Sequence, residues 1–183
     1  MNPYAAITGL AKQPDVLKLV GGIISSYAEI EFRMLQIFNH AKGLADNDLT
    51  WFQTRMESAR FRVFQDTVEP LFHQAGMARE YEAIANALDK CRRLRNQYAH
   101  CLWSTGGALR FFSFEEAAKV PANGPMPYKT TSEQLLTDQL NYFVDLAIVL
   151  SECIKTLKGD PLVPGGLESA MARLATPVAD YVS

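Results

Sequence analysis

The chain has 183 residues and a formal net charge of −2, and 48% of its residues are apolar. This length fits one large domain, or one domain with appendages, rather than two full domains. The apolar fraction is high enough to build a buried core, which excludes a chain that is disordered by composition.

The three cysteines and the N-terminal sequence indicate the cellular compartment of the protein. Cys91, Cys101 and Cys153 are odd in number and form no Cys-x-x-Cys pair, so we expect neither a disulfide framework nor a zinc site. The N-terminus lacks the basic and apolar blocks of a secretory signal, and no apolar run approaches the roughly 20 residues of a membrane-spanning helix. We therefore expect a cytoplasmic protein with no membrane partner.

Charge is distributed unevenly along the chain. Residues 55–110 carry nine Lys and Arg against six Asp and Glu, whereas residues 111–183 carry five against nine. The middle excess comes mainly from Lys90, Arg92, Arg93 and Arg95. Such a local patch can bind phosphates even on an acidic protein. The alternative is an ordinary solvated helix face.

The first half of the chain predicts two helical segments. One begins at Pro14, where proline suits the first helical position, and runs to about residue 39, with Gly43 as its stop. Its apolar positions recur at helical spacing: Leu17, Val20, Ile24, Tyr27, Ile30, Met34, Leu35 and Phe38. A second helical stretch opens near residues 46–48, and Pro70 is expected to bend or end it.

The second half predicts two more long helices and a small β-hairpin. A helix is expected over about residues 77–103, ended by Gly106 and Gly107. Aromatic and proline-rich segments between residues 108 and 131 are typical of a hairpin with a loop at its tip. A capping box at residues 131–134 then opens a helix that ends near Lys158.

These elements predict an all-α antiparallel bundle of four to five helices, with the hairpin inserted before the last long helix. Residues 1–158 form the bundle. Residues 159–183 are expected to form a tail or oligomerisation arm with a short helix near residues 167–175.

The end of the third predicted helix carries the strongest chemical signal. Asn96 and His100 lie one turn apart on one face, and Arg92 continues that row a turn earlier. Arg95 is displaced about 100° around the axis from Asn96, but its long side chain can reach back. The cluster offers an imidazole that titrates near neutrality, a permanent cation and an amide. These groups can move a proton and stabilise a pentacovalent phosphate during attack by an RNA 2′-hydroxyl.

This stretch resembles the HEPN superfamily, whose signature is arginine, a polar residue, a few further positions and histidine near a helix end. The match is Arg95-Asn96-Gln97-Tyr98-Ala99-His100. The bundle with an extra hairpin is also similar to that family, over roughly residues 14–158. Many relatives have glycine after the histidine, whereas this chain has Cys101.

The resemblance implies a homodimeric endoribonuclease that cleaves RNA without a metal ion, in a composite cleft formed by two copies; we expect no cofactor. By this analogy His100 is the general acid and base, and Arg95 stabilises the phosphate. Asn96 helps to orient these two side chains. Lys90, Arg92 and Arg93 are the candidate RNA-binding residues. Many such proteins are toxins with an antitoxin, or members of antiviral defence complexes. Others are non-catalytic modules for dimerisation that bind a partner protein or a nucleotide, and this alternative stays open.

One carboxylate points to a supporting contact. Glu31 falls within the apolar stripe of the first helix, and an ionised carboxylate there needs a partner. We expect it to pair with an arginine of the motif helix, Arg95 first and Arg92 second. The alternative is that Glu31 lies at the edge of the bundle and reaches water.

The site residues also have structural interpretations. His100 could simply cap the helix end, and His40 and His73 are expected to be structural because they lie near helix ends without such neighbours. The three histidines are too dispersed to form a metal centre in one subunit.

Overall fold

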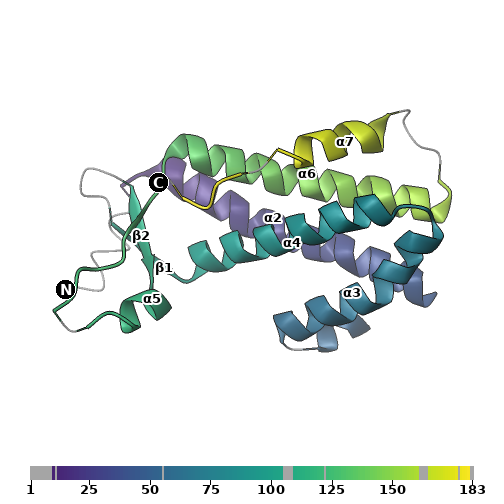
Figure 1. Cartoon of the computed structure of the whole chain (residues 1–183), viewed down its shortest axis with the longest axis horizontal. Helices are drawn as coiled ribbons and strands as arrows, with labels where there is room; N and C mark the ends of the chain where they lie inside the picture. The colour runs from purple at the N-terminus through teal and green to yellow at the C-terminus, as the bar shows by residue number, and fades with distance from the viewer. Residues whose placement is uncertain are drawn as a thin grey trace.

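The computed structural model describes residues 10, 12–54, 56–104, 109–121, 123–160, 165–176 and 178–181. The longest helices lie side by side, with shorter elements at both ends of the molecule (Figure 1). The helices are α2 (Pro14–Lys42), the 3-10 turn η1 (Thr50–Gln53), α3 (Glu57–Gln74), α4 (Ala78–Ala99), α5 (Phe114–Ala118), α6 (Glu133–Lys158) and α7 (Gly166–Leu174). The molecule is therefore mainly helical, as predicted.

Capping residues set the boundaries of the two longest helices, α2 and α6. Gly43 adopts a left-handed conformation with φ 67°, and its N–H bonds to the carbonyl of His40 at 3.1 Å. At the start of α6 the Ser132 hydroxyl accepts from the Leu135 N–H at 3.1 Å. Gly159 ends α6 in the same left-handed conformation. The predicted start at Pro14 and the predicted end at Lys158 are both confirmed.

Helix directions differ from an all-antiparallel bundle. Along α2 and α6, Gly22 lies by Leu140, and Asp46, just beyond α2, pairs with Lys158, so these helices run the same way. Helix α3 is also parallel to α2, because the loop after Gly43 returns the chain before α3 begins. Only α4, of the four longest helices, runs in the opposite direction (Figure 1). Pro70 lies inside α3, which continues to Gln74, so the helix does not end at Pro70. The other expectation, a bend at Pro70, stays a prediction.

The sheet is larger than the predicted hairpin. Strands β1 (Cys101–Ser104), β2 (Arg110–Ser113) and β3 (Lys129–Thr130) form one antiparallel sheet in the order β1-β2-β3. In the register of β1 with β2, Trp103 lies opposite Phe111. The prediction that the third helix continues to residue 103 is wrong, because these residues pair as a strand. Gly106 and Gly107, its predicted stop, lie outside the described residues.

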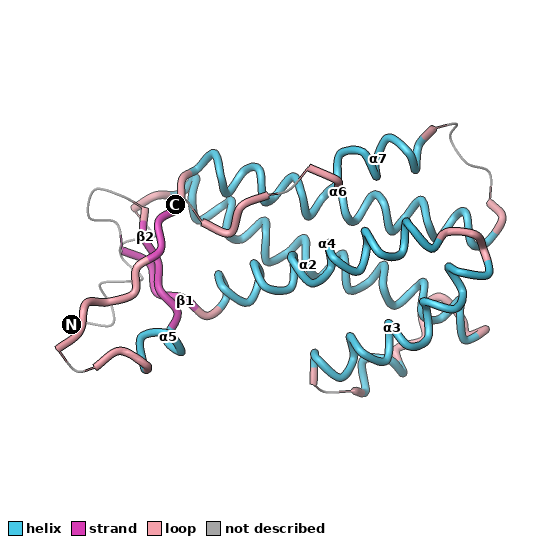
Figure 2. Tube along the Cα trace, in the orientation of Figure 1, coloured by secondary structure: helices cyan, strands magenta, loops and turns pink. Residues whose placement is uncertain are grey.

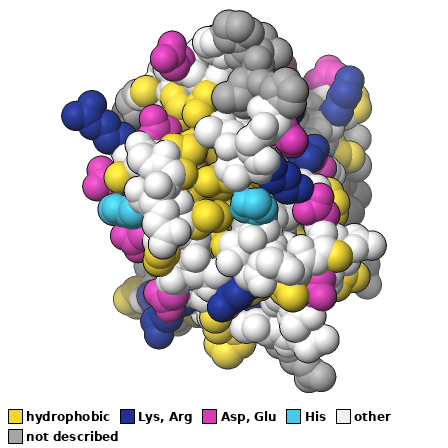
Figure 3. Space-filling view, turned by 90° about the vertical axis from the view of Figure 1, so that its right-hand side faces the viewer, with side chains coloured by type: hydrophobic (Ala, Val, Ile, Leu, Met, Phe, Trp, Pro, Cys, Tyr) yellow, Lys and Arg dark blue, Asp and Glu magenta, His cyan; other side chains and the backbone are white. Residues whose placement is uncertain are grey.

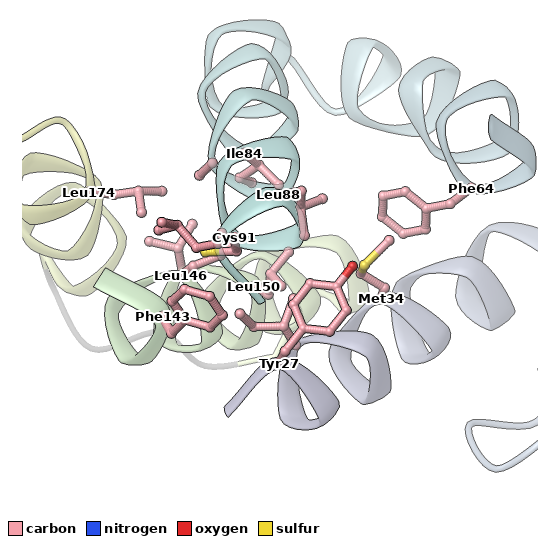
Figure 4. Close-up of a cluster of buried hydrophobic side chains, with 14 of the residues drawn as sticks. Tyr27, Met34, Phe64, Ile84, Leu88, Cys91, Phe143, Leu146, Leu150 and Leu174 are labelled. Atoms are coloured by element: carbon pink, nitrogen blue, oxygen red, sulfur yellow. The ribbon is translucent and has the colours of Figure 1, made fainter. Parts of the chain in front are cut away.

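The core lies between the long helices. Figure 4 shows side chains from five helices converging: Tyr27, Met34, Phe64, Ile84, Leu88, Cys91, Phe143, Leu146, Leu150 and Leu174. Leu17 and Ile24, which the sequence pattern placed on the inner stripe, are 48% and 38% exposed. Val16 and Ile23 are fully buried instead, so the buried face of α2 is rotated slightly from the predicted one.

The short C-terminal helix is part of this core. Ala170 and Leu174 of α7 are buried, and α7 lies along α6 (Figure 2). The predicted helix near residues 167–175 is confirmed, and it docks on the bundle. At the bundle end away from the sheet, charges of both signs are interspersed with apolar side chains (Figure 3). No helix in the described ranges combines the length and the apolar character needed to cross a bilayer.

Candidate functional site

An open groove of about 990 Å³ lies where α4 meets the sheet. Its walls come from α3, α4, α5 and all three strands: Glu57, Arg93, Arg95, Asn96, Gln97, Ala99, His100, Cys101, Ser113, Glu115, Glu116 and Lys129. The three predicted catalytic residues, Arg95, Asn96 and His100, therefore line one groove.

The junction between helix and strand positions His100. Helix α4 ends at Ala99, and the backbone N–H of His100 bonds to the carbonyl of Asn96 at 3.2 Å. The chain then enters β1, whose Trp103 ring stacks 5.6 Å from that of Tyr98. This packing fixes the helix end, so the His100 backbone caps the helix while its side chain is exposed. Within the described chain, the side chains of Asn96 and His100 make no hydrogen bond and are open to a ligand.

The Arg95 guanidinium is held by two residues from other helices. Its Nη2 lies 2.5 Å from Glu57 Oε1, which also accepts from the Tyr27 hydroxyl at 2.9 Å. The guanidinium carbon lies 4.5 Å from the centroid of the Tyr27 ring, within cation–π distance. Burial, and then the charge of Glu57, raises the pKa of the Tyr27 phenol, so it stays protonated and donates. Arg95 is therefore fixed in orientation at the groove wall.

Glu31 has a different partner from the predicted one. Its Oε1 lies 2.9 Å from Nη2 of Arg60 on α3, and the Glu31 side chain is 20% exposed. The prediction that it pairs with Arg95 or Arg92 is wrong. Glu57, the first residue of α3, reaches Arg95, while Glu31 lies one turn further along α2 than Tyr27 and faces Arg60. The carboxylate in the apolar stripe does have a cationic partner, as expected.

The predicted RNA-binding cations are paired with acids. Asp89 binds both Arg92 and Arg93, at 2.7 and 2.9 Å, and Lys90 lies 2.6 Å from Asp180. The hydrogen bond that Arg92 donates to the Asp89 carboxylate raises the pKa of the Arg92 guanidinium. Of the three cations, Arg93 lines the groove and is 58% exposed, whereas Lys90 and Arg92 are not among its lining residues.

Several groove residues had no signal in the sequence. Glu57 is 38 positions from Arg95, so only the fold brings them together. Helix α5 contributes Glu115 and Glu116 to the groove, and Lys129 lies 2.6 Å from Glu116. The charged residues that α4 and α5 contribute are all paired: Arg93 with Asp89, Arg95 with Glu57, Glu115 with Lys119 and Glu116 with Lys129.

Other reactive groups are poorly suited to chemistry here. Burial raises the pKa of the Cys101 thiol to about 12, so it is protonated at neutral pH and is a weak nucleophile. His40 and His73 lie in the last turns of α2 and α3 and do not line the groove. Across the described ranges, no group of three or more His, Cys, Asp or Glu side chains is arranged to hold a metal ion.

Comparison with known proteins gives no match to a family model, a curated protein or a solved structure.

Proposed function

We propose that this chain is an endoribonuclease that cleaves RNA by attack of a 2′-hydroxyl on the adjacent phosphate, without a metal ion. The observation that carries the proposal is the shared groove: an exposed imidazole, an oriented guanidinium and an unbonded amide line it together. Phosphoryl transfer of this type needs positioning, proton transfer and charge stabilisation.

The proposed steps use three residues. The His100 imidazole accepts the proton of the 2′-hydroxyl while that oxygen forms a bond to phosphorus. The bond from phosphorus to the 5′-oxygen of the next nucleotide breaks, and the departing oxygen takes a proton, which the imidazolium can return. Arg95 donates hydrogen bonds to the non-bridging phosphate oxygens, and the Asn96 amide orients the reacting groups. The products are a 2′,3′-cyclic phosphate and a 5′-hydroxyl.

We propose that the enzyme acts as a homodimer, as the motif resemblance implies. Supporting this, Leu17, Ile24 and Phe32 on α2 are 48%, 38% and 41% exposed and recur at intervals of two helical turns. An exposed apolar stripe of this kind is typical of an association surface. In the cell, such an enzyme would act as a toxin or a defence effector, held in check by an antitoxin or a complex partner.

A second candidate is a non-catalytic module that binds a nucleotide or a partner protein. One observation favours it: Arg95 is only 20% exposed and its charge is already balanced by Glu57. In this case the groove would bind a phosphate group without turnover.

The two functions separate in a cleavage assay in EDTA with a mixed RNA substrate. We expect the wild type to cleave, and both His100→Ala and Arg95→Ala to lose at least about 100-fold in rate, as expected for removal of an acid–base group or a phosphate-stabilising group. His73→Ala is the matched control, because His73 is also exposed at a helix end but lies outside the groove. Equal rates for all four proteins, or no cleavage by the wild type, would favour the non-catalytic module.

A further inference from the structure

The chain returns to the groove after α7. Residues 178–181, here called the C-terminal strap, run back from α7 toward the sheet (Figures 1 and 2). Their contacts lie on α4, α6 and β3, which brings the strap to the flank of the groove.

Backbone contacts anchor the strap to a buried amide. Gln139 of α6 is fully buried, and its Nε2 donates to the carbonyl oxygens of Ala179 at 2.7 Å and Asp180 at 3.3 Å. Its Oε1 accepts from the Tyr98 hydroxyl at 2.6 Å. Tyr98 belongs to the motif helix, so a buried hydrogen-bond chain links the strap to the groove wall.

Side-chain contacts of the strap cover groups that could bind RNA. The Asp180 carboxylate lies 2.6 Å from Lys90 Nζ. The backbone carbonyl of Asp180 accepts a hydrogen bond from Gln97 Nε2 at 3.3 Å. The Tyr181 ring centroid lies 5.6 Å from Lys129 Nζ. Gln97 and Lys129 both line the groove, and Lys90 precedes Gln97 by two turns of α4.

The strap thus places an anion on one lysine and an aromatic ring beside another. A nucleotide offers the same pair of groups, a phosphate and a base. We propose that the strap occupies a nucleotide subsite beside the groove, and that an RNA strand must displace Asp180 and Tyr181 to extend from the groove onto Lys90. In that subsite Lys90 binds a phosphate and Lys129 lies beside a base. This inference rests on the proposed ribonuclease function and adds an autoinhibitory contact to it.

The test is binding of a 2′-O-methyl oligonucleotide, which lacks the attacking hydroxyl, measured by fluorescence anisotropy. The double variant Asp180→Asn with Tyr181→Ala removes the competing groups but keeps the backbone carbonyls that bond Gln139. We expect it to bind about fivefold more tightly than the wild type, because a partly exposed ion pair holds the strap. The slope of log affinity against log salt should steepen by about 0.7, the value for one more phosphate contact on a single strand.

Two further variants make the result specific. Adding Lys90→Ala to the double variant should abolish its gain in affinity. Asp160→Asn removes one negative charge, as Asp180→Asn does, but at the far end of α6. We expect it to leave the affinity unchanged. Affinity that is unaltered or weaker in the double variant overturns the inference, whether or not the wild type cleaves RNA. The cleavage assay in EDTA reports on the proposed function separately, so the two failures are distinguishable.

Discussion

At the scale of single residues, the Glu57 carboxylate determines how Arg95 is presented. It bonds both the Arg95 guanidinium and the buried Tyr27 hydroxyl. Removing the carboxylate would leave two donors that must find other acceptors, and a buried donor without an acceptor costs about 1–3 kcal/mol. Removing only its charge keeps an oxygen acceptor but loses the ion pair with the guanidinium. Glu57 is therefore a positioning residue, and it acts through Arg95.

We predict that Glu57→Gln lowers the rate of RNA cleavage about tenfold or more, because the guanidinium loses its fixed orientation. Glu57→Asp should restore part of the rate. Glu31→Gln is the matched control, since it breaks a similar partly buried pair between helices, that of Glu31 on α2 with Arg60 on α3, and Glu31 does not line the groove. A Glu57→Gln enzyme that is as active as Glu31→Gln would show that Arg95 needs no such support.

At this scale the sequence predicts only the relative positions of residues that are close together in the chain. The relation of Asn96 to His100 follows from the helical repeat, because Asn96 lies in the last turn of α4 and His100 is the residue that caps it. The partner of Glu31 could not be predicted, since Arg60 and Arg95 lie on different helices and only the tertiary packing selects between them. Glu57 gave no signal at all, because its role depends on where α3 begins.

At the scale of elements, the aromatic packing of β1 sets the end of the motif helix. Trp103 is 7% exposed and lies 5.3 Å from the Phe111 ring as well as against Tyr98. We predict that Trp103→Ala lowers the free energy of unfolding by about 3–5 kcal/mol, as is typical of a buried large-to-small change. Urea denaturation followed by circular dichroism measures it.

Tyr128→Ala is the control for this prediction. Tyr128 also contacts an aromatic ring of the sheet but is 38% exposed, so its loss should cost no more than about 1 kcal/mol. Equal losses for the two variants would mean that Trp103 does not hold the junction.

The sequence predicted the long helices well because their caps and apolar periods are local features. It missed β1, because Cys101–Ser104 continues the helical pattern of α4 and becomes a strand only by pairing with β2. Helix direction was also missed. The loop after Gly43 is long enough to return the chain, and no local pattern shows that it does.

At the scale of the whole molecule, cysteine thiols that stay protonated in the folded state make the stability fall at alkaline pH. Burial raises the pKa of the Cys101 and Cys153 thiols from 9.0 to about 12, and that of Cys91 rises as well. The unfolded chain therefore releases these protons at lower pH than the folded one. Since the unfolded state then binds fewer protons, stability falls as pH rises from about 9 toward 12.

We predict that the free energy of unfolding falls by about 1 kcal/mol per thiol between pH 8 and pH 10. In Cys153→Ala the free energy of unfolding should fall less between these pH values, by the contribution of one thiol. Urea denaturation curves at the two pH values provide the measurement, and equal stabilities at both would contradict the buried, protonated state of the thiols.

The chemistry of the cut RNA ends decides whether a 2′-hydroxyl is the attacking group. The measurement is to digest a defined RNA in EDTA with the wild type and identify both termini by mass spectrometry. Attack by the 2′-hydroxyl predicts a 2′,3′-cyclic phosphate and a 5′-hydroxyl, and no cleavage at a 2′-deoxy position. A 5′-phosphate end, cleavage at the 2′-deoxy position, or intact RNA would contradict the proposed ribonuclease.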